Sequence, residues 1–395
     1  MAGGGTGGTL WIKVMVAAAV LLTLSLFLHE PGWLHATILA IGGLLMVFAS
    51  CESMVLCVDG IAKRSGWNPF VAGTMGGLAS NLPEVVMLGF VLAAEPRIGF
   101  IVVMFTLHVG SLAFGIYSLI LPRDADGHAR LPAPLVRLST DLYACAAGVF
   151  LTMGLLMLAM YVFAMDRGAS DSPAALSAVD LYVTGGILLL VEIVAIWRLV
   201  VRFSGDADGA AESEATETID TVAEEEAPPS RGKIVALGLV GIVAAVWGGH
   251  GVGEFAEVLV HSLRQAGYSE MVGALVLSIF ACAGAYAMAA TAHSKGMYNV
   301  ALASVSGAVT QVPFVVLPFA LLMIGAFSQL GISEAMVGGG ALPIDMQTTT
   351  VVLLGFPPLL ILWKAVQDDA AVNWLETVTM MAIFSLTIYF LAVHG

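Results

Sequence analysis

The chain has 395 residues, of which 59% are hydrophobic and only 11% are charged, whereas soluble domains carry roughly 25% charged residues. This composition excludes an ordinary soluble domain and predicts an integral membrane protein whose surroundings are the lipid bilayer. The formal net charge is −14, and we expect no nucleic-acid partner.

Eleven apolar stretches are long enough to cross a bilayer as helices, because a hydrocarbon core of about 30 Å needs roughly 20 helical residues. They cover residues 10–28, 36–60, 69–93, 98–121, 140–165, 178–202, 234–262, 270–293, 299–326, 349–365 and 374–394. We therefore predict an all-α integral membrane protein with about 11 transmembrane helices. All four cysteines fall inside these stretches, so they are interpreted as small core residues and not as a disulfide framework.

The basic residues are distributed unevenly between the two sides that eleven spans define. Twelve lysines and arginines fall on the side of the N-terminus, and three, Arg97, Arg167 and Arg264, fall on the other. This bias predicts a cytoplasmic N-terminus and a C-terminus outside, in an inner or plasma membrane of prokaryotic type.

The third apolar stretch contains the run ASNLPEVV at residues 79–86, which places a proline beside a glutamate within a membrane span. A carboxylate there costs about 3 kcal/mol, so Glu84 is expected to face a polar cavity on an ion or proton path, with a structural ion pair as the alternative. Pro83 has no N–H and leaves the carbonyl one turn earlier unpaired. Freed carbonyls, the Asn81 amide and the Glu84 carboxylate together predict a hard-oxygen site for Ca²⁺, Na⁺ or a competing proton.

Nine acids and no base lie between Arg202 and Arg231, which accounts for most of the net charge. Such a segment cannot bury enough apolar surface to fold alone. We predict an acidic cytoplasmic loop at residues 203–232, either a flexible linker or a segment that attracts cations.

The two segments that flank this loop are similar. Each has an acid-bearing helix, a short basic connection, a glycine and an aromatic residue (Gly66 and Trp67, Gly267 and Tyr268), and then a helix rich in small residues. We predict an N-terminal segment and leading helix at 1–33, followed by two five-helix repeats at 34–202 and 233–395. Because each repeat has an odd number of spans, the second should be inverted relative to the first, with an ion site at the membrane midplane.

The run VDGIAKRSGWNPFVAGT leading into SNLPEVV resembles the first repeat of the cation/calcium exchanger superfamily, the sodium/calcium exchanger membrane region. The run GAVTQVPFVVLPFALL at residues 307–322 is similar to the second repeat of its calcium/proton exchanger branch. The resemblance implies ten core helices with an optional leading helix, and secondary active antiport of cations. It implies no cofactor beyond the transported cation, Ca²⁺ or Na⁺, and H⁺, and an oligomer is possible.

The chain departs from this family at two positions. Aligning Gly66 with Gly267 places Ala285 opposite Glu84, so the second membrane-centre carboxylate is missing. Phe114 and Gly115 stand where the family has a serine and an asparagine. A divalent ion held by Glu84 alone would be poorly compensated, so Ca²⁺ selectivity is left open.

Other acids are candidates to replace the missing carboxylate. Glu52 and Asp59 share a face of the second stretch. In the seventh stretch a spacing of 4, 3 and 4 residues places one set of side chains on a single helical face: His250, Glu254, Glu257 and His261. We predict that Glu52 and either Glu254 or Glu257 complete the site, with Glu84 and Glu254 as metal ligands. For Glu257 and His261 the alternative is contact with lipid headgroups.

Several polar residues are further candidates. Thr310 and Gln311 match the family's Thr-Gln pair and can supply oxygen atoms, with helix packing as the alternative. His108 is a possible proton relay, or a buried hydrogen-bonded histidine. Glu257 and His250 are the other possible relays.

These observations leave three classes of function open. The first, which we favour, is a proton-coupled antiporter that exports Ca²⁺ or a related cation, with Na⁺ (or K⁺)/H⁺ or Na⁺/Ca²⁺ exchange as alternatives. The second is a transporter-derived protein that no longer transports ions and acts as a sensor. The third is an intramembrane metalloenzyme, but the chain has no HExxH motif and no clear nucleophile and base pair, so we predict that it is not an enzyme.

Overall fold

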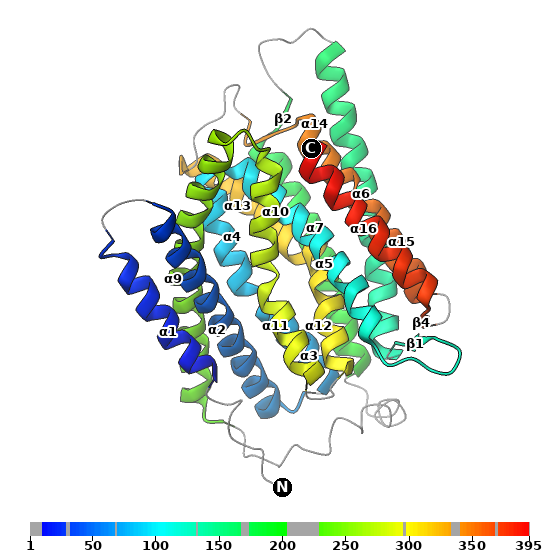
Figure 1. Cartoon of the computed structure of the whole chain (residues 1–395). Coiled ribbons are helices and arrows are strands. Elements are labelled where there is room, and N and C mark those ends of the chain that lie inside the picture. Colours follow the sequence, from blue (N-terminus) through cyan, green and yellow to red (C-terminus); the bar gives the residue numbers. More distant parts are fainter. Residues whose placement is uncertain are drawn as a thin grey trace. The chain divides into compact units, whose positions relative to one another are not determined.

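The computed structural model describes residues 10–28, 32–67, 69–131, 133–166, 174–203, 229–294, 298–332, 340–367 and 370–394. Figure 1 shows that these residues are mainly helical. The helices of the first half are α1 (Leu10–Ser25), α2 (Trp33–Ser65), α3 (Pro69–Ser80), α4 (Leu82–Ala94), α5 (Pro96–Ile120), α6 (Ala133–Asp166) and α7 (Ala178–Phe203). The predicted acidic loop at 203–232 lies almost wholly outside the described residues.

The helices of the second half are α9 (Arg231–Gln265), α10 (Glu270–Ala281), α11 (Ala283–Ser294), α12 (Tyr298–Gln311), α13 (Leu317–Leu330), α14 (Met346–Leu353), α15 (Phe356–Gln367) and α16 (Trp374–His394). A short π-helix, η2 (Val312–Val316), joins α12 to α13. Four two-residue strands, β1 (Ala129–Arg130), β2 (Ala175–Leu176), β3 (Leu342–Pro343) and β4 (Ala371–Val372), lie in the connections.

The protein is an all-α integral membrane protein. Within the described ranges, nine helical segments are long and apolar enough to cross a membrane, and α1 and α10 are shorter apolar helices. Each of the eleven predicted stretches contains at least one helix, but the third, eighth, ninth and tenth are interrupted. The predicted number of eleven spans therefore stays a prediction.

The chain forms two compact units, and their positions relative to one another are not determined. Unit 1 comprises residues 1–90 and 190–255, and unit 2 comprises residues 91–189 and 256–395. Each unit takes segments from both predicted repeats, so this division differs from the predicted repeat boundaries. The repeats themselves stay a prediction.

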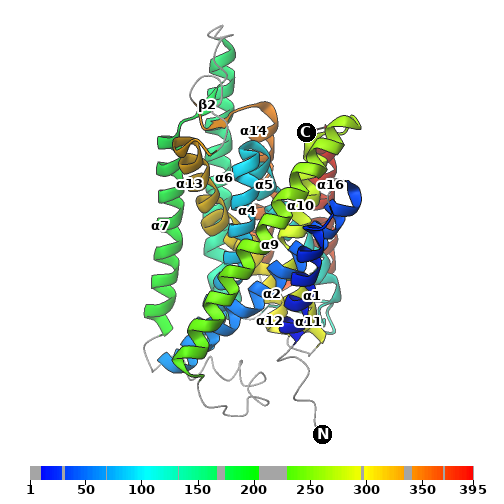
Figure 2. The ribbon, with the colours of Figure 1, turned by 90° about the vertical axis from the view of Figure 1, so that its left-hand side faces the viewer.

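In unit 1, α2 packs against α9 along a seam of small residues. A Cβ atom on Gly43 would lie 2.8 Å from the Gly248 carbonyl oxygen, and one on Gly248 would lie 2.9 Å from the Gly43 carbonyl oxygen. The missing side chains let the two backbones approach closely, as is common between membrane helices. Ser50 then donates to the Gly241 carbonyl at 2.6 Å, and Ser53 to the Leu237 carbonyl at 2.8 Å. Figures 1 and 2 show the two helices adjacent in both views.

In unit 2, α5 is the central helix. Its residues from Ile98 to Ser111 are all buried, and it packs against α10, α12 and α16. Two antiparallel strand pairs, β1 with β4 and β2 with β3, join connections that are far apart in sequence. A continuous apolar sequence without charges thus forms a helix that is enclosed by other helices on all sides.

Candidate functional site

The run that contains Glu84 forms a break between two helices in unit 1. α3 ends at Ser80, α4 begins at Leu82, and Asn81 forms the turn between them. The Asn81 N–H donates to the Leu78 carbonyl at 3.2 Å, and the Asn81 carbonyl accepts from the Val85 N–H at 2.9 Å. Pro83 has no N–H, so it cannot bond to the carbonyl four residues earlier. The predicted interruption of the third apolar stretch is therefore present at Asn81.

Glu84 lies in the first turn of α4. The N–H groups at the start of a helix point along its axis, and the helix dipole favours a negative charge there. The Glu84 side chain is half-buried, and the neighbouring Asn81 is 7% exposed. The break thus places a carboxylate in the first turn of a half-helix, three residues after a buried amide.

α2 contacts this break from the side. The Cys51 thiol donates to the Ser80 carbonyl, with Sγ and O 3.2 Å apart, and the Ser80 hydroxyl donates to the Gly77 carbonyl at 2.7 Å. Glu52, the next residue of α2, is half-buried. Both Glu52 and Glu84 lie close enough to the Cys51 thiol to interact with it electrostatically. Among the predicted site residues, the structure places Glu84, Asn81 and Glu52 in one region of unit 1.

His250 and Glu254 form a separate pair on α9. His250 Nε2 lies 3.2 Å from Glu254 Oε1, and the two side chains are 60% and 45% exposed. The His250 ring lies 5.7 Å from the Phe90 ring of α4, six residues, or about 9 Å of helix, beyond Glu84. Glu254 contacts His250, and its role as a second carboxylate beside Glu84 stays a prediction.

An apolar groove lies next to this pair in unit 1. It has a volume of about 490 Å³ and is lined by Phe90, Ile242, Val243, Val246, Trp247 and His250. Apart from the imidazole its lining is apolar, as expected of a surface that faces lipid.

Unit 2 contains a second helix break with the same backbone pattern. α10 ends at Ala281, α11 begins at Ala283, and the Cys282 carbonyl accepts from the Tyr286 N–H at 3.1 Å. Cys282 follows Asn81 by 201 residues (282 − 81), the same interval as between Gly66 and Gly267 (267 − 66). Those two glycines have φ of 63° and 78°, a left-handed conformation that costs a glycine little when it ends a helix. At the second break, the position equivalent to Glu84 is Ala285.

The candidate relay His108 faces away from the second break. The Cys282 sulfur lies 3.8 Å from the Thr106 carbonyl oxygen on α5. His108 is two residues after Thr106, which is a rotation of about 200° around the α5 axis. The His108 side chain therefore lies on another face of α5, next to α14. His108 Nε2 lies 3.4 Å from the Val351 carbonyl oxygen, so Nε2 is assigned as the donor. The side chain is 1% exposed, and its Nδ1 has no hydrogen-bond partner in the part of the chain that the structure describes.

Three more predicted residues also lie in unit 2. Thr310 is buried in α12, and its hydroxyl lies 3.3 Å from the carbonyls of both Ser306 and Gly307. Gln311 is the last residue of α12, directly before the π-helix, and such single-turn π segments are frequent at functional sites. Glu257 is an exposed residue of α9. The roles of Thr310, Gln311, Glu257 and His108 stay predictions.

No group of three or more His, Cys, Asp or Glu side chains that could hold a metal ion occurs among the residues the structure covers. A cation beside Glu84 would therefore need amide, hydroxyl or carbonyl oxygens as further ligands. The break itself is a source of such oxygens.

The sequence interpretation missed the parts played by two cysteines. Cys51 and Cys282 are buried core residues, as predicted, whereas Cys145 is exposed and that prediction was wrong. In addition, Cys51 bonds to the carbonyl before the first break and Cys282 forms the second break. The 201-residue interval between the repeats could have indicated Cys282. Nothing in the sequence indicated the contact of Cys51.

Comparison with known proteins is informative only at the level of structure. No protein-family model matches the chain, and no curated protein matches its sequence. The crystal structure of the H⁺/Ca²⁺ exchanger CAX superposes with a TM-score of 0.62 at 12% identity, covering 97% of this chain and 92% of that one. The chain has the fold of the cation/calcium exchangers.

Two further exchangers share this fold. Native YfkE gives a TM-score of 0.59 at 14% identity over 97% of this chain and 99% of its own. The sodium–calcium exchanger NCX_Mj gives 0.50 at 16% identity over 89% and 98%. The exchanger fold expected from the resemblance of the first repeat is confirmed.

Proposed function

We propose that this protein is a secondary active cation antiporter, which exports Ca²⁺ or a related cation in exchange for protons. The observation that carries the proposal is the position of Glu84 in an exchanger fold. It lies in a membrane span, in the first turn of a half-helix, directly after the Asn81 break and close to Cys51 and Glu52 of α2. The fold is shared with Ca²⁺/H⁺ exchangers and a sodium–calcium exchanger.

The mechanism follows from competition for one carboxylate. When Glu84 loses its proton, its negative charge together with the Asn81 oxygen and backbone carbonyls of the break can bind a cation. When it regains a proton, the charge that holds the cation disappears. Each ion can then bind only after the other has left, so a single site couples the two fluxes.

A second candidate, Na⁺ or K⁺ exchange for protons, is favoured by Ala285. The second break carries no carboxylate, so Glu84 supplies one negative charge where two would balance a divalent ion. A monovalent cation needs less compensation in a low-dielectric site. The identity of the cation is therefore the question that the transport assay must answer.

The test is transport by purified protein in proteoliposomes. With an imposed pH gradient, the wild type should move Ca²⁺, Na⁺ or K⁺, and Glu84→Gln, which keeps the shape but not the charge, should reduce the flux to that of empty vesicles. The matched control is Glu192→Gln, because Glu192 is a half-buried carboxylate in the span of α7, a helix that contains neither break. Its flux should stay within about twofold of the wild type.

Two results would contradict the proposal. Wild-type protein that moves none of the three cations under either a proton or a Na⁺ gradient would exclude antiport and favour the non-transporting sensor. Equal loss of flux in Glu84→Gln and Glu192→Gln would show that Glu84 has no special role.

A further inference from the structure

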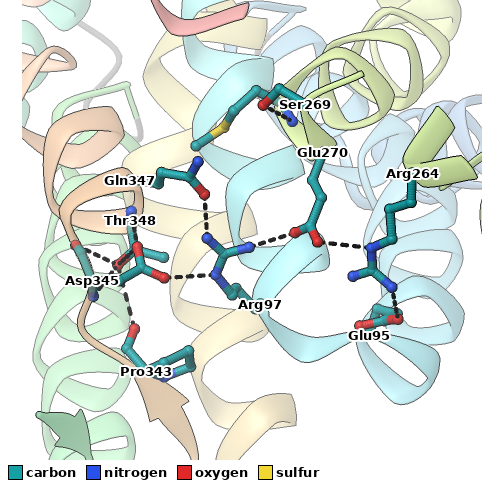
Figure 3. A network of polar contacts seen from close by, with 10 residues as sticks. Glu95, Arg97, Arg264, Ser269, Glu270, Pro343, Asp345, Gln347 and Thr348 are labelled. Atoms are coloured by element: carbon teal, nitrogen blue, oxygen red, sulfur yellow. Dashed lines mark hydrogen bonds and ion pairs between the residues drawn. The ribbon is translucent and has the colours of Figure 1, made fainter. Parts of the chain in front are cut away.

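A network of ion pairs in unit 2 joins the ends of four helices, and the proposed exchange does not use it. Arg97, in the first turn of α5, donates to Asp345 Oδ2 at 2.7 Å and to Glu270 Oε2 at 2.5 Å, and also to the Gln347 side chain. The other oxygen of Glu270 accepts from Arg264 Nε at 2.7 Å. Figure 3 shows Arg97 between Asp345 and Gln347 on one side and Glu270 on the other.

The network holds the start of α10. Glu270 is the first residue of α10, and both of its carboxylate oxygens are engaged, one by Arg97 of α5 and one by Arg264 of α9. Arg264 lies in turn 3.3 Å from Glu95, next to the start of α5. A guanidinium has five donors in a rigid plane, so Arg97 can serve acceptors on two helices at once.

The same network fixes α14. Asp345 caps this helix, because Oδ1 accepts from the Thr348 N–H at 2.8 Å while Oδ2 accepts from Arg97. Arg97 therefore connects the first turns of α5, α10 and α14. Its side chain and that of Glu270 are only 25% and 26% exposed, so this pair is less weakened by water than a surface ion pair.

α10 is tied to α5 at both of its ends. Its first residue, Glu270, bonds to Arg97, and Cys282, directly after its last residue, lies against the Thr106 carbonyl of α5. The two helices therefore run in the same direction, and the second break lies at the far end of a short rigid helix. A helix of 12 residues is about 18 Å long, so a shift at Glu270 is carried to Cys282.

We propose that Arg97 is a positioning residue: through Glu270 it holds α10 against α5, and thereby sets the position of the second helix break at Cys282. The inference about packing stands on the contacts of unit 2 alone. Its consequence for transport rests on the proposed function.

The position of the break can be measured without transport, because Cys282 is a native thiol that is 4% exposed. A small membrane-permeant maleimide is added to the protein, and the alkylation rate of each cysteine is read by mass spectrometry. Arg97→Gln should raise the rate at Cys282 by about tenfold, since a lost charge-assisted network favours local opening. Glu270→Gln should have the same effect, and the double variant should add little, because the two side chains form one interaction.

Three controls make the result specific. Arg97→Lys keeps the charge but can donate hydrogen bonds to fewer acceptors, so the alkylation rate of Cys282 should be intermediate. Arg130→Gln should leave the rate unchanged, because the Arg130 side chain is 85% exposed and 3.6 Å from Asp124. Cys51 is an internal reference: it is 6% exposed and lies in unit 1, so its rate should not change in any of these variants.

An unchanged rate at Cys282 in Arg97→Gln and Glu270→Gln would overturn the proposal. Equal acceleration at Cys51 and Cys282 would also overturn it, because it would indicate general loss of stability. If Arg97→Gln does not fold, Glu270→Gln decides alone.

Transport provides a second measurement. In vesicles, Arg97→Gln should raise the KM for the transported cation by roughly threefold or more while the maximal rate changes less, as expected when a ligand group is displaced and not removed. If the wild type transports no cation, the proposed function fails but the alkylation rates still test the role of Arg97. Faster alkylation at Cys282 with an unchanged KM would confine Arg97 to packing and exclude its effect on the cation site.

Discussion

At the scale of residues, the two helix breaks differ in one chemically decisive position. Glu84 follows the first break, and Ala285 occupies the equivalent place after the second. Both breaks have a carbonyl that accepts from the N–H four residues later, at 2.9 Å and 3.1 Å. The two breaks therefore share a backbone hydrogen-bond pattern. They differ in charge, because only the first break is followed by a carboxylate.

This asymmetry predicts the effect of Ala285→Glu. Ala285 is half-buried, and a carboxylate there would add a second negative charge at the second break, which favours a divalent over a monovalent cation. The Ca²⁺ flux relative to the Na⁺ flux in proteoliposomes should rise by about tenfold. Ala283→Glu, two residues away on another face of α11, is the matched control. An equal change of selectivity in both variants would refute a specific role for position 285.

At the scale of elements, one connection in unit 2 is organised by Asp124. The Asp124 carboxylate stabilises this loop between α5 and β1. Its Oδ1 accepts hydrogen bonds from the N–H groups of His128 at 2.9 Å and Asp126 at 3.1 Å. Arg123, the preceding residue, donates to the Gly127 and Val372 carbonyls at 2.9 Å each. The loop thereby supports the pairing of β1 with β4 (Figure 1).

The pH dependence of this loop follows from the same bonds. The His128 N–H, with the Asp126 N–H, the charge of His128 and a hydrogen bond from the Arg130 side chain as further causes, holds the pKa of Asp124 below its ordinary value. A depressed pKa means that the carboxylate stabilises the folded loop above the ordinary pKa and loses this effect as the pH falls through the lower folded value. Amide hydrogen exchange of residues 124–130, corrected for intrinsic rates, should therefore be constant down to about pH 4 and accelerate below it.

The control for this prediction is Asp124→Asn, which removes the titrating group. Its exchange in residues 124–130 should be faster than in the wild type at neutral pH and should show no step at acidic pH. A step of the same size in this variant would assign the pH dependence to another group.

At the scale of the whole molecule, the orientation of the chain in the membrane is the main untested prediction. The uneven distribution of lysine and arginine predicts a cytoplasmic loop at 203–232 and a C-terminus on the opposite side. An epitope inserted between residues 206 and 226 should be reached by antibody only from the cytoplasmic side, and one added after Gly395 only from the outside. Labelling of both epitopes from one side would require a different number of membrane crossings.

The sequence by itself determined the class of the protein and the place of the first break. Long apolar stretches must form helices in a bilayer because backbone groups have no water to bond to, and Pro83 removes one helical hydrogen bond because it lacks an N–H. These features depend only on the properties of residues that are close together in the chain, so they can be predicted from the sequence.

The tertiary structure decided which side chains meet. Cys51 contacts the carbonyl of Ser80, 29 residues further along the chain, and Arg97 bonds to Asp345, 248 residues away. It also decided that His108 faces α14 and not the second break. Periodicity assigns a residue to a face of a helix, but the neighbour of that face depends on how the helices pack, and packing is determined by the shapes of many side chains together.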